Sequence, residues 1–192
     1  MLLTLILICV AALALMFLTP VYIGYATHNR LVALDQRCET AFGEIDVHLK
    51  HRHNLIPPLV ETVRGFAKHE SDILTGITKA RAEALQATSP EVRLSAEQNL
   101  TQNINALIGM AERYPELKAS THFGDLRREL VDAENRVTAS RRFYNLAVEE
   151  YGITLRQFPG STIGRLFKMN LRTRYDIGIE RVLIDEPLAI KF

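Results

Sequence analysis

The sequence has few of the features by which small secreted, catalytic or nucleic-acid-binding proteins are recognised. Its 192 residues include two cysteines, Cys9 and Cys38, and neither lies in a metal-ligand pattern, so no disulfide framework is predicted. The net charge of +1 lacks the excess of lysine and arginine that a phosphate-binding surface needs, which argues against a nucleic-acid partner. The length suits one ordinary domain with a short membrane element.

Sequence motifs of the common enzyme classes are also missing. There is no Gly-rich phosphate loop, no Gly-x-Ser-x-Gly elbow and no His-Glu-x-x-His zinc motif, and the Glu-x-x-His repeats of di-iron helical bundles do not occur. His48, His51 and His53 lack further ligands to complete a metal site, so we interpret them as a polar, partly exposed cluster. We therefore predict no enzymatic activity, no cofactor and no bound metal.

The N-terminal segment contains no Asp, Glu, Lys, Arg or His before His28. As a helix, residues 2–25 would run roughly 36 Å, enough to cross the roughly 30 Å hydrocarbon layer of a bilayer. A basic n-region and a good small-x-small cleavage site are missing, so residues 1–27 are predicted to be a retained transmembrane anchor rather than a cleaved signal peptide. The residues expected to define this anchor are Leu2, Phe17, the helix-bending Pro20, and the interfacial Tyr22 and Tyr25.

Behind the anchor, apolar residues recur every three or four positions, which is the spacing of helices that pack through one stripe. Helices are predicted over residues 31–56, 57–84, 92–111 and 123–158. The first is expected to continue from the transmembrane helix as one long rod that breaks only at Pro57-Pro58, because proline disrupts a helix interior. Ser89 is expected to cap the third helix, and Ser120 or Thr121 the fourth. Asp46 interrupts the first stripe and is expected to pair with an arginine or a helix N-terminus.

These patterns predict an all-α fold in three parts. The transmembrane helix is followed, over residues 28–159, by an antiparallel up-down four-helix bundle with long helices. Residues 160–192 are expected to form a short C-terminal amphipathic helix and an extended apolar arm. The arm is expected to dock on its own bundle or on a neighbouring subunit.

The segment that follows the fourth helix is strongly basic. Residues 152–175 contain five cations and no acid, and an up-down topology would return them to the bilayer. Two interpretations stay open: an amphipathic segment at an anionic membrane surface, or the solvated face of a terminal helix that packs on the bundle. The candidates for membrane contact are Arg165, Phe167, Lys168, Arg172 and Arg174.

Several strings in the chain are too specific to result from amphipathicity alone. They are EIDVHLKHRHNLIPPLVETVRGFAKHES, TKARAEA, AENRVTASRRFYNLAVEEYG and FPGSTIG, and with them the sequence resembles the LemA family of bacterial membrane proteins over roughly residues 31–167. The positions that carry the resemblance include Asp46, Arg52, Pro57, Glu61, Arg81, Asn135, Arg136, Arg141, Tyr144, Asn145 and Pro159. The chain departs from the pattern at His53, Asn54 and Pro58.

The resemblance implies an N-terminal anchor, an antiparallel helical domain and no established reaction, and a magnetosome-associated branch suggests a membrane-organising role. We hypothesise a non-enzymatic scaffold in the bacterial cytoplasmic (inner) membrane that self-associates as a homo-oligomer and organises or shapes the lipid bilayer. Cations that follow the span, such as Arg30 and Arg37, favour a cytoplasmic soluble domain. The alternative is a membrane-tethered sensor or adaptor that binds a small ligand or an unidentified partner protein between its helices.

Overall fold

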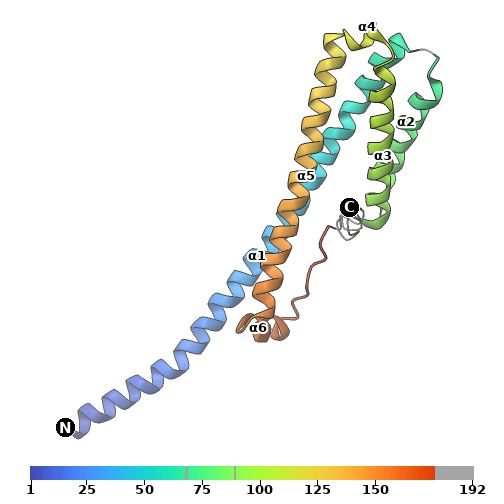
Figure 1. Ribbon diagram of the computed structural model, residues 1–192. Helices are drawn as coiled ribbons and strands as arrows, with labels where there is room; N and C mark the ends of the chain where they lie inside the picture. The colour runs from blue at the N-terminus through green and yellow to red at the C-terminus, as the bar shows by residue number, and fades with distance from the viewer. Residues whose placement is uncertain (68, 89, 176–192) are drawn as a thin grey trace, which may run out of the picture. The chain divides into compact units, whose positions relative to one another are not determined.

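The computed structural model describes residues 1–67, 69–88 and 90–175, and these residues form helices without strands (Figure 1). The helices are α1 (Leu2–Phe66), α2 (Ser71–Gln86), α3 (Pro90–Ala111), α4 (Pro115–Lys118), α5 (Thr121–Arg156) and α6 (Gly160–Leu166). They divide into two compact units. Unit 1 comprises Met1–Glu44 and Ser140–Phe192, and unit 2 comprises Ile45–Ala139. The all-α prediction is confirmed for the described residues, and the up-down order of a four-helix bundle stays a prediction.

Among the helices described, α1 is long and apolar enough to cross a membrane by length and composition. Its apolar N-terminal residues are exposed, among them Leu2, Phe17, Tyr22 and Tyr25. The helix continues without interruption through Pro20. An exposed apolar surface of this extent is what a segment surrounded by lipid presents.

The predicted helix break at Pro57-Pro58 is wrong, because α1 passes through both prolines and ends at Phe66. Proline has no backbone N–H, so Pro57 leaves the carbonyl of His53 without its usual helical donor. Arg81 of α2 supplies a replacement, since its Nε donates a hydrogen bond of 2.8 Å to the His53 carbonyl oxygen. The predicted second helix is thus divided between the end of α1 and α2.

We expect the cost of Arg81→Ala to depend on whether residue 57 is proline. In the natural sequence the substitution leaves the His53 carbonyl without a donor, which should lower the free energy of unfolding by about 1 kcal/mol. In a Pro57→Ala background the restored backbone N–H supplies the hydrogen bond, so the same substitution should cost clearly less. A double-mutant cycle measured by chemical denaturation gives the coupling, and equal costs in both backgrounds would exclude this role for Arg81.

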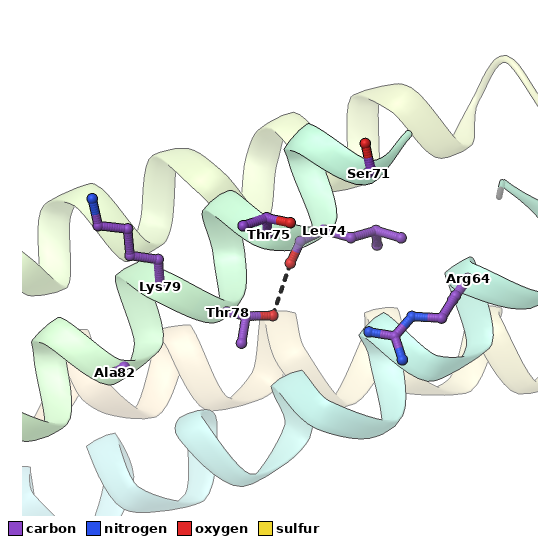
Figure 2. A pocket seen from close by; sticks show the side chains of 7 residues that line it. All are labelled: Arg64, Ser71, Leu74, Thr75, Thr78, Lys79 and Ala82. Atoms are coloured by element: carbon purple, nitrogen blue, oxygen red, sulfur yellow. Dashed lines mark hydrogen bonds between the residues drawn. The ribbon is translucent and has the colours of Figure 1, made fainter. Parts of the chain in front are cut away.

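Residues of α1 and α2 line an open groove of about 680 Å³ (Figure 2). Two cations, Arg64 and Lys79, line it together with the hydroxyl-bearing Ser71, Thr75 and Thr78. The Thr78 hydroxyl donates a hydrogen bond of 2.8 Å to the Leu74 carbonyl oxygen within α2. The groove therefore offers two cations and three hydroxyl groups on a largely apolar surface.

Unit 2 is built around one apolar cluster to which α1, α2, α3, α4 and α5 all contribute. Its most buried members include Leu59, Val63, Ile77, Leu100, Leu107 and Leu117. On α5, Leu130 is 3% exposed, whereas Arg127 lies on the outer face. The helical periodicity of the sequence therefore assigned the buried face of α5 correctly, whereas Phe66 and Val92, expected on the apolar stripes of the second and third helices, are exposed. At the start of α5, the hydroxyl oxygen of Ser120 accepts a hydrogen bond from the Phe123 N–H at 3.4 Å, as its predicted capping role requires.

In unit 1 the C-terminal helix is shorter than predicted, because α6 ends at Leu166 and the chain reverses at Lys168, which has a φ of 53°. The predicted short C-terminal helix is present as α6, but it ends before most of the basic segment, and residues 170–175 run extended after the turn. The turn lies beside α1, since the rings of Phe167 and His28 are 4.2 Å apart. This contact is close to the end of the apolar run of α1. The predicted arm after Tyr175 lies outside the described residues, as does the capping residue Ser89.

Candidate functional site

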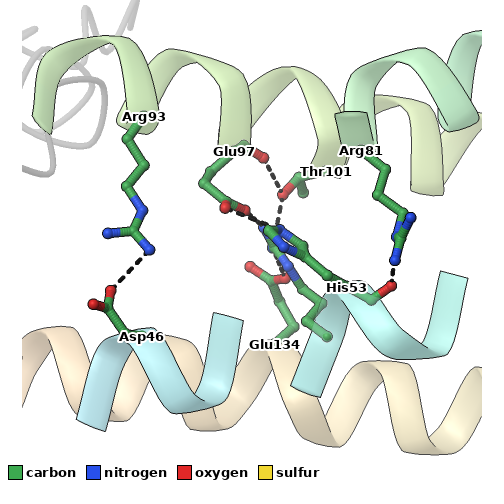
Figure 3. Close-up of polar contacts among 8 residues, drawn as sticks. Asp46, His53, Arg81, Arg93, Glu97, Thr101 and Glu134 are labelled. Carbon is green, nitrogen blue, oxygen red and sulfur yellow. Dashed lines mark hydrogen bonds and ion pairs between the residues drawn. The ribbon is translucent and has the colours of Figure 1, made fainter. Parts of the chain in front are cut away.

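The most deeply buried charges of unit 2 lie where α1, α3 and α5 approach one another (Figure 3). Arg52 is 1% exposed, and its guanidinium donates hydrogen bonds to the carboxylates of Glu97 and Glu134. It also donates to the Thr101 hydroxyl at 3.1 Å. The second oxygen of Glu97 lies 3.0 Å from Nε2 of His53. We call these five residues the buried charge cluster.

Helical periodicity places Arg52 and Glu97 inside and the partly exposed Glu134 at the edge of the core. Arg52 lies three positions after Leu49, Glu97 three before Leu100, and Glu134 four after Leu130, so each shares the face of a core residue. Sequence reasoning identified Arg52 as a motif position but missed Glu97, Glu134 and Thr101. The available signal was that Glu97 and Glu134 occupy positions of the apolar stripes. A charge buried there without a partner would be costly, so an oppositely charged partner could have been expected.

Glu97 is the buried carboxylate of the cluster, with 2% of its surface exposed. Burial alone would raise the pKa of its carboxyl group, but the close contact with His53 and the charge of Arg52 outweigh burial and lower it. Both carboxylate oxygens of Glu97 have a cationic or histidine partner. The arrangement is thus an ion-pair network that holds three helices together, with its charges directed at one another.

Because folding lowers the pKa of Glu97, this carboxylate stabilises the protein above its unfolded pKa of about 4.5. That stability is lost as the pH falls through the lower folded value. We expect the free energy of unfolding to decrease below pH 4.5, by up to about 1.4 kcal/mol per pH unit for one proton. Denaturation curves from pH 2 to 7 measure this slope, which Glu97→Gln should flatten and the exposed Glu129→Gln should not. An unchanged slope in Glu97→Gln would contradict the assignment.

Two further polar predictions have different outcomes in unit 2. Asp46 pairs with Arg93 at 2.8 Å, which confirms the expected arginine partner. His53, by contrast, is buried rather than partly exposed, because it faces Glu97 across the core. His51 is exposed, so the three histidines do not share one site. Among the described residues no group of His, Cys, Asp and Glu is arranged to hold a metal.

In unit 1, three side chains of α5 hold the extended residues 170–175, which we call the strap. The hydroxyls of Tyr144 and Tyr151 donate to the carbonyl oxygens of Thr173 and Asn170, at 2.9 and 3.1 Å. The amide of Asn145 pairs with the backbone of Tyr175, donating to its carbonyl at 3.0 Å and accepting from its N–H at 2.8 Å. Burial raises the pKa of both tyrosine hydroxyls, which keeps them protonated as donors.

The cations of the strap are paired with acids from distant parts of the chain. Arg172 donates to Asp35 at 2.6 and 3.2 Å and to Glu39 at 2.8 Å, both on α1. The hydrogen bonds to Asp35 raise the pKa of Arg172 by more than partial burial lowers it. Arg174 lies 3.1 Å from Glu149 of α5. Although residues 152–175 contain no acid, these two cations are therefore paired with acids of α1 and α5.

Both the buried charge cluster and the strap fall in the region that matches a known family. The sequence model of the LemA family matches residues 41–192. The chain belongs to the LemA family. The protein LemA of Metamycoplasma hominis is 23% identical over 170 residues, which cover 86% of this chain and 75% of that protein. The predicted resemblance is thereby confirmed.

Two magnetosome proteins are also similar to this LemA-family chain. MamQ of Magnetospirillum gryphiswaldense is 19% identical over 169 residues, which cover 74% of this chain and 61% of that protein. MamQ 2 of Paramagnetospirillum magneticum is 20% identical over 158 residues, which cover 69% and 58%. The matches therefore span less than two thirds of these two relatives. None of the names is that of an enzyme.

The structure divides the LemA motif residues between the two units. In unit 2, Arg52 and Arg81 reach buried acceptors, whereas Glu61, Asn135 and Arg136 are exposed. In unit 1, Tyr144 and Asn145 hold the strap, the guanidinium of Arg141 lies 5.0 Å from the centre of the Tyr175 ring, and Pro159 directly precedes α6. No single cleft collects these residues in the described parts of the chain. Arg52, Arg81, Tyr144 and Asn145 each join two parts of the chain.

The candidates for membrane contact separate into two groups. Arg172 and Arg174 form the ion pairs of the strap. Arg165, Phe167 and Lys168 are exposed around the end of α6, and Phe167 is 53% exposed. Two cations beside an exposed aromatic ring are the composition expected of a segment that contacts anionic lipid. A location at the membrane surface stays a prediction for these three residues.

Proposed function

We propose that this LemA-family protein is a non-enzymatic scaffold, anchored in a membrane by α1, that self-associates and organises the bilayer. The observation that carries the proposal is the uninterrupted course of α1 from Leu2 to Phe66. Its exposed apolar residues suit lipid, while its later residues contribute to the core of unit 2. The same helix therefore contains both the membrane anchor and core residues of unit 2.

Two further observations support a structural role over catalysis. The charged groups of the buried charge cluster pair with one another, so they are not available to bind or act on a substrate. Relatives are named as magnetosome proteins rather than as enzymes, which agrees with the membrane-organising role that the family resemblance implies.

The mass of the detergent-extracted full-length protein tests self-association directly. We expect a particle of several copies by light scattering, and clustering or reshaping of vesicles by electron microscopy after reconstitution. Protein-free vesicles of the same lipid serve as the control. A monomer in detergent and in nanodiscs, with vesicles unchanged, would overturn the proposal.

We propose the bacterial cytoplasmic membrane as the location, with the soluble part in the cytoplasm. Arg30 and Arg37 follow the apolar run of α1 closely, as the positive-inside rule requires of a cytoplasmic flank. Protease added to intact spheroplasts should leave the soluble part uncut. Cleavage before lysis would place it on the outer side.

We expect the exposed end of α6 to contact anionic lipid in the reconstituted full-length protein. The chain contains no tryptophan, so Phe167→Trp introduces a single fluorescent reporter. Brominated lipids in anionic vesicles should quench it, and both Arg165→Glu with Lys168→Glu and raised salt should weaken the quenching. Phe143→Trp, on the outer side of α5, is the control. Quenching equal in neutral and anionic vesicles would reject the electrostatic contribution.

A second candidate function, a ligand-binding sensor or adaptor, is favoured by the groove beside α2. Arg64 and Lys79 with three hydroxyl-bearing side chains suit a small anionic molecule (Figure 2). Inorganic phosphate is the simplest probe. A rise in melting temperature with phosphate that Lys79→Glu abolishes, in a protein that is monomeric, would favour this function over the scaffold.

A further inference from the structure

Four of the hydrogen bonds that hold the strap are made with its backbone. Tyr144, Asn145 and Tyr151 together make four hydrogen bonds with backbone atoms of residues 170–175. Backbone pairing of this kind recognises an extended peptide by its conformation, as in other modes of extended-peptide binding. These side chains therefore form a binding site for a short extended segment.

Acidic side chains give this site a sequence preference. Asp35 and Glu39 bind Arg172, and Glu149 binds Arg174, so the site accepts two arginines separated by one residue. We call the site the strap groove; it comprises Asp35, Glu39, Tyr144, Asn145, Glu149 and Tyr151. An extended Arg-x-Arg segment is the ligand that these charges and hydrogen-bonding groups fit.

The connection that holds the strap in its own groove is strained. Lys168 has a φ of 53°, in the left-handed region that side chains other than glycine rarely adopt. This residue lies between the end of α6 and the strap, so the turn must keep this conformation while the strap folds back on its own copy. Opening the turn relieves the strain and frees the strap as one piece.

We propose that the strap exchanges between copies, so that residues 170–175 of one molecule occupy the strap groove of a second molecule. The inference deepens the proposed self-association and rests on it. A second copy is the fitting occupant because it carries the same Arg-x-Arg segment in the same register. Exchange preserves every contact of the groove, and copies anchored in one membrane meet at high effective concentration.

Chemical cross-linking of the full-length protein in a bilayer tests the exchange. The background is Cys9→Ser with Cys38→Ala, which removes the two native thiols. One tagged copy carries Glu149→Cys and a second, differently tagged copy carries Arg174→Cys, because the long side chains at these positions meet at 3.1 Å and a short bismaleimide can replace their combined length. We expect a cross-linked pair of the two tags. The matched control replaces Arg174→Cys with Arg165→Cys, which lies outside the strap and should give several-fold less product.

A chain that carries both Glu149→Cys and Arg174→Cys reports whether the groove is occupied at all. Formation of its intrachain cross-link, with interchain product no greater than the control, would overturn the exchange. Failure of both cross-links would overturn the groove itself as a site for residues 170–175. The mass of the unmodified particle is independent of either result. An oligomer without exchange would be consistent with the proposed function but not with strap exchange. A monomer would exclude both the proposed self-association and the exchange.

Discussion

Arg52→Ala should lower the free energy of unfolding by about 3–5 kcal/mol, although it removes a polar side chain rather than an apolar one. The reason is that the guanidinium is the shared partner of two carboxylates, Glu97 and Glu134. Glu97 would keep only His53 while still buried, and the cost of an uncompensated buried charge exceeds that of most lost contacts.

Chemical denaturation of the full-length protein in detergent, followed by circular dichroism, measures this loss. Arg136→Ala is the matched control, because Arg136 is 62% exposed and 3.9 Å from Asp132, and it should change stability by no more than about 0.5 kcal/mol. Replacing Arg52 and Glu97 together by methionine should recover part of the loss, since an apolar pair needs no compensation. Similar effects of Arg52→Ala and Arg136→Ala would refute the role of the buried charge cluster.

Leu130→Ala should cost about 2–5 kcal/mol, the range for a leucine removed from a packed core. Leu130 is 3% exposed and belongs to the cluster that all the helices of unit 2 share. The truncation removes apolar contacts and leaves a cavity that its neighbours fill only partly. Arg127→Ala, three residues earlier on the outer face, should stay within about 0.5 kcal/mol. Thermal and chemical unfolding both measure the difference, and equal costs would show that the two faces of α5 are reversed.

The sequence predicted α3 and α5 well because their apolar stripes are local patterns. The ends of both helices lie within two residues of the predicted positions. The course of α1 through Pro57 could not be predicted in the same way. The donor that replaces the missing N–H belongs to Arg81, which is 28 positions further along the chain. A rule about proline within one helix contains no information about such a partner.

The polar sites show the same limit more strongly. Arg52 meets Glu97 and Glu134 at separations of 45 and 82 positions, and Arg172 meets Asp35 at 137. Charge counted along the sequence marked residues 152–175 as basic and unpaired, whereas in the folded unit α1 and α5 supply acidic partners to Arg172 and Arg174. Stripe positions could have indicated which charges are buried. They could not have indicated which pairs form.

The hydrogen bond between Arg81 and the His53 carbonyl has an evolutionary consequence. Replacing Pro57 first restores a backbone donor and releases Arg81 from its role, so that arginine is then free to drift. Replacing Arg81 first leaves the His53 carbonyl without a hydrogen-bond donor, which lowers stability and is opposed by selection. Substitutions at the two positions should therefore follow a fixed order along lineages. LemA relatives with proline at the position of Pro57 should retain a donor at the position of Arg81, and ancestral reconstruction should recover the loss of proline before the loss of arginine.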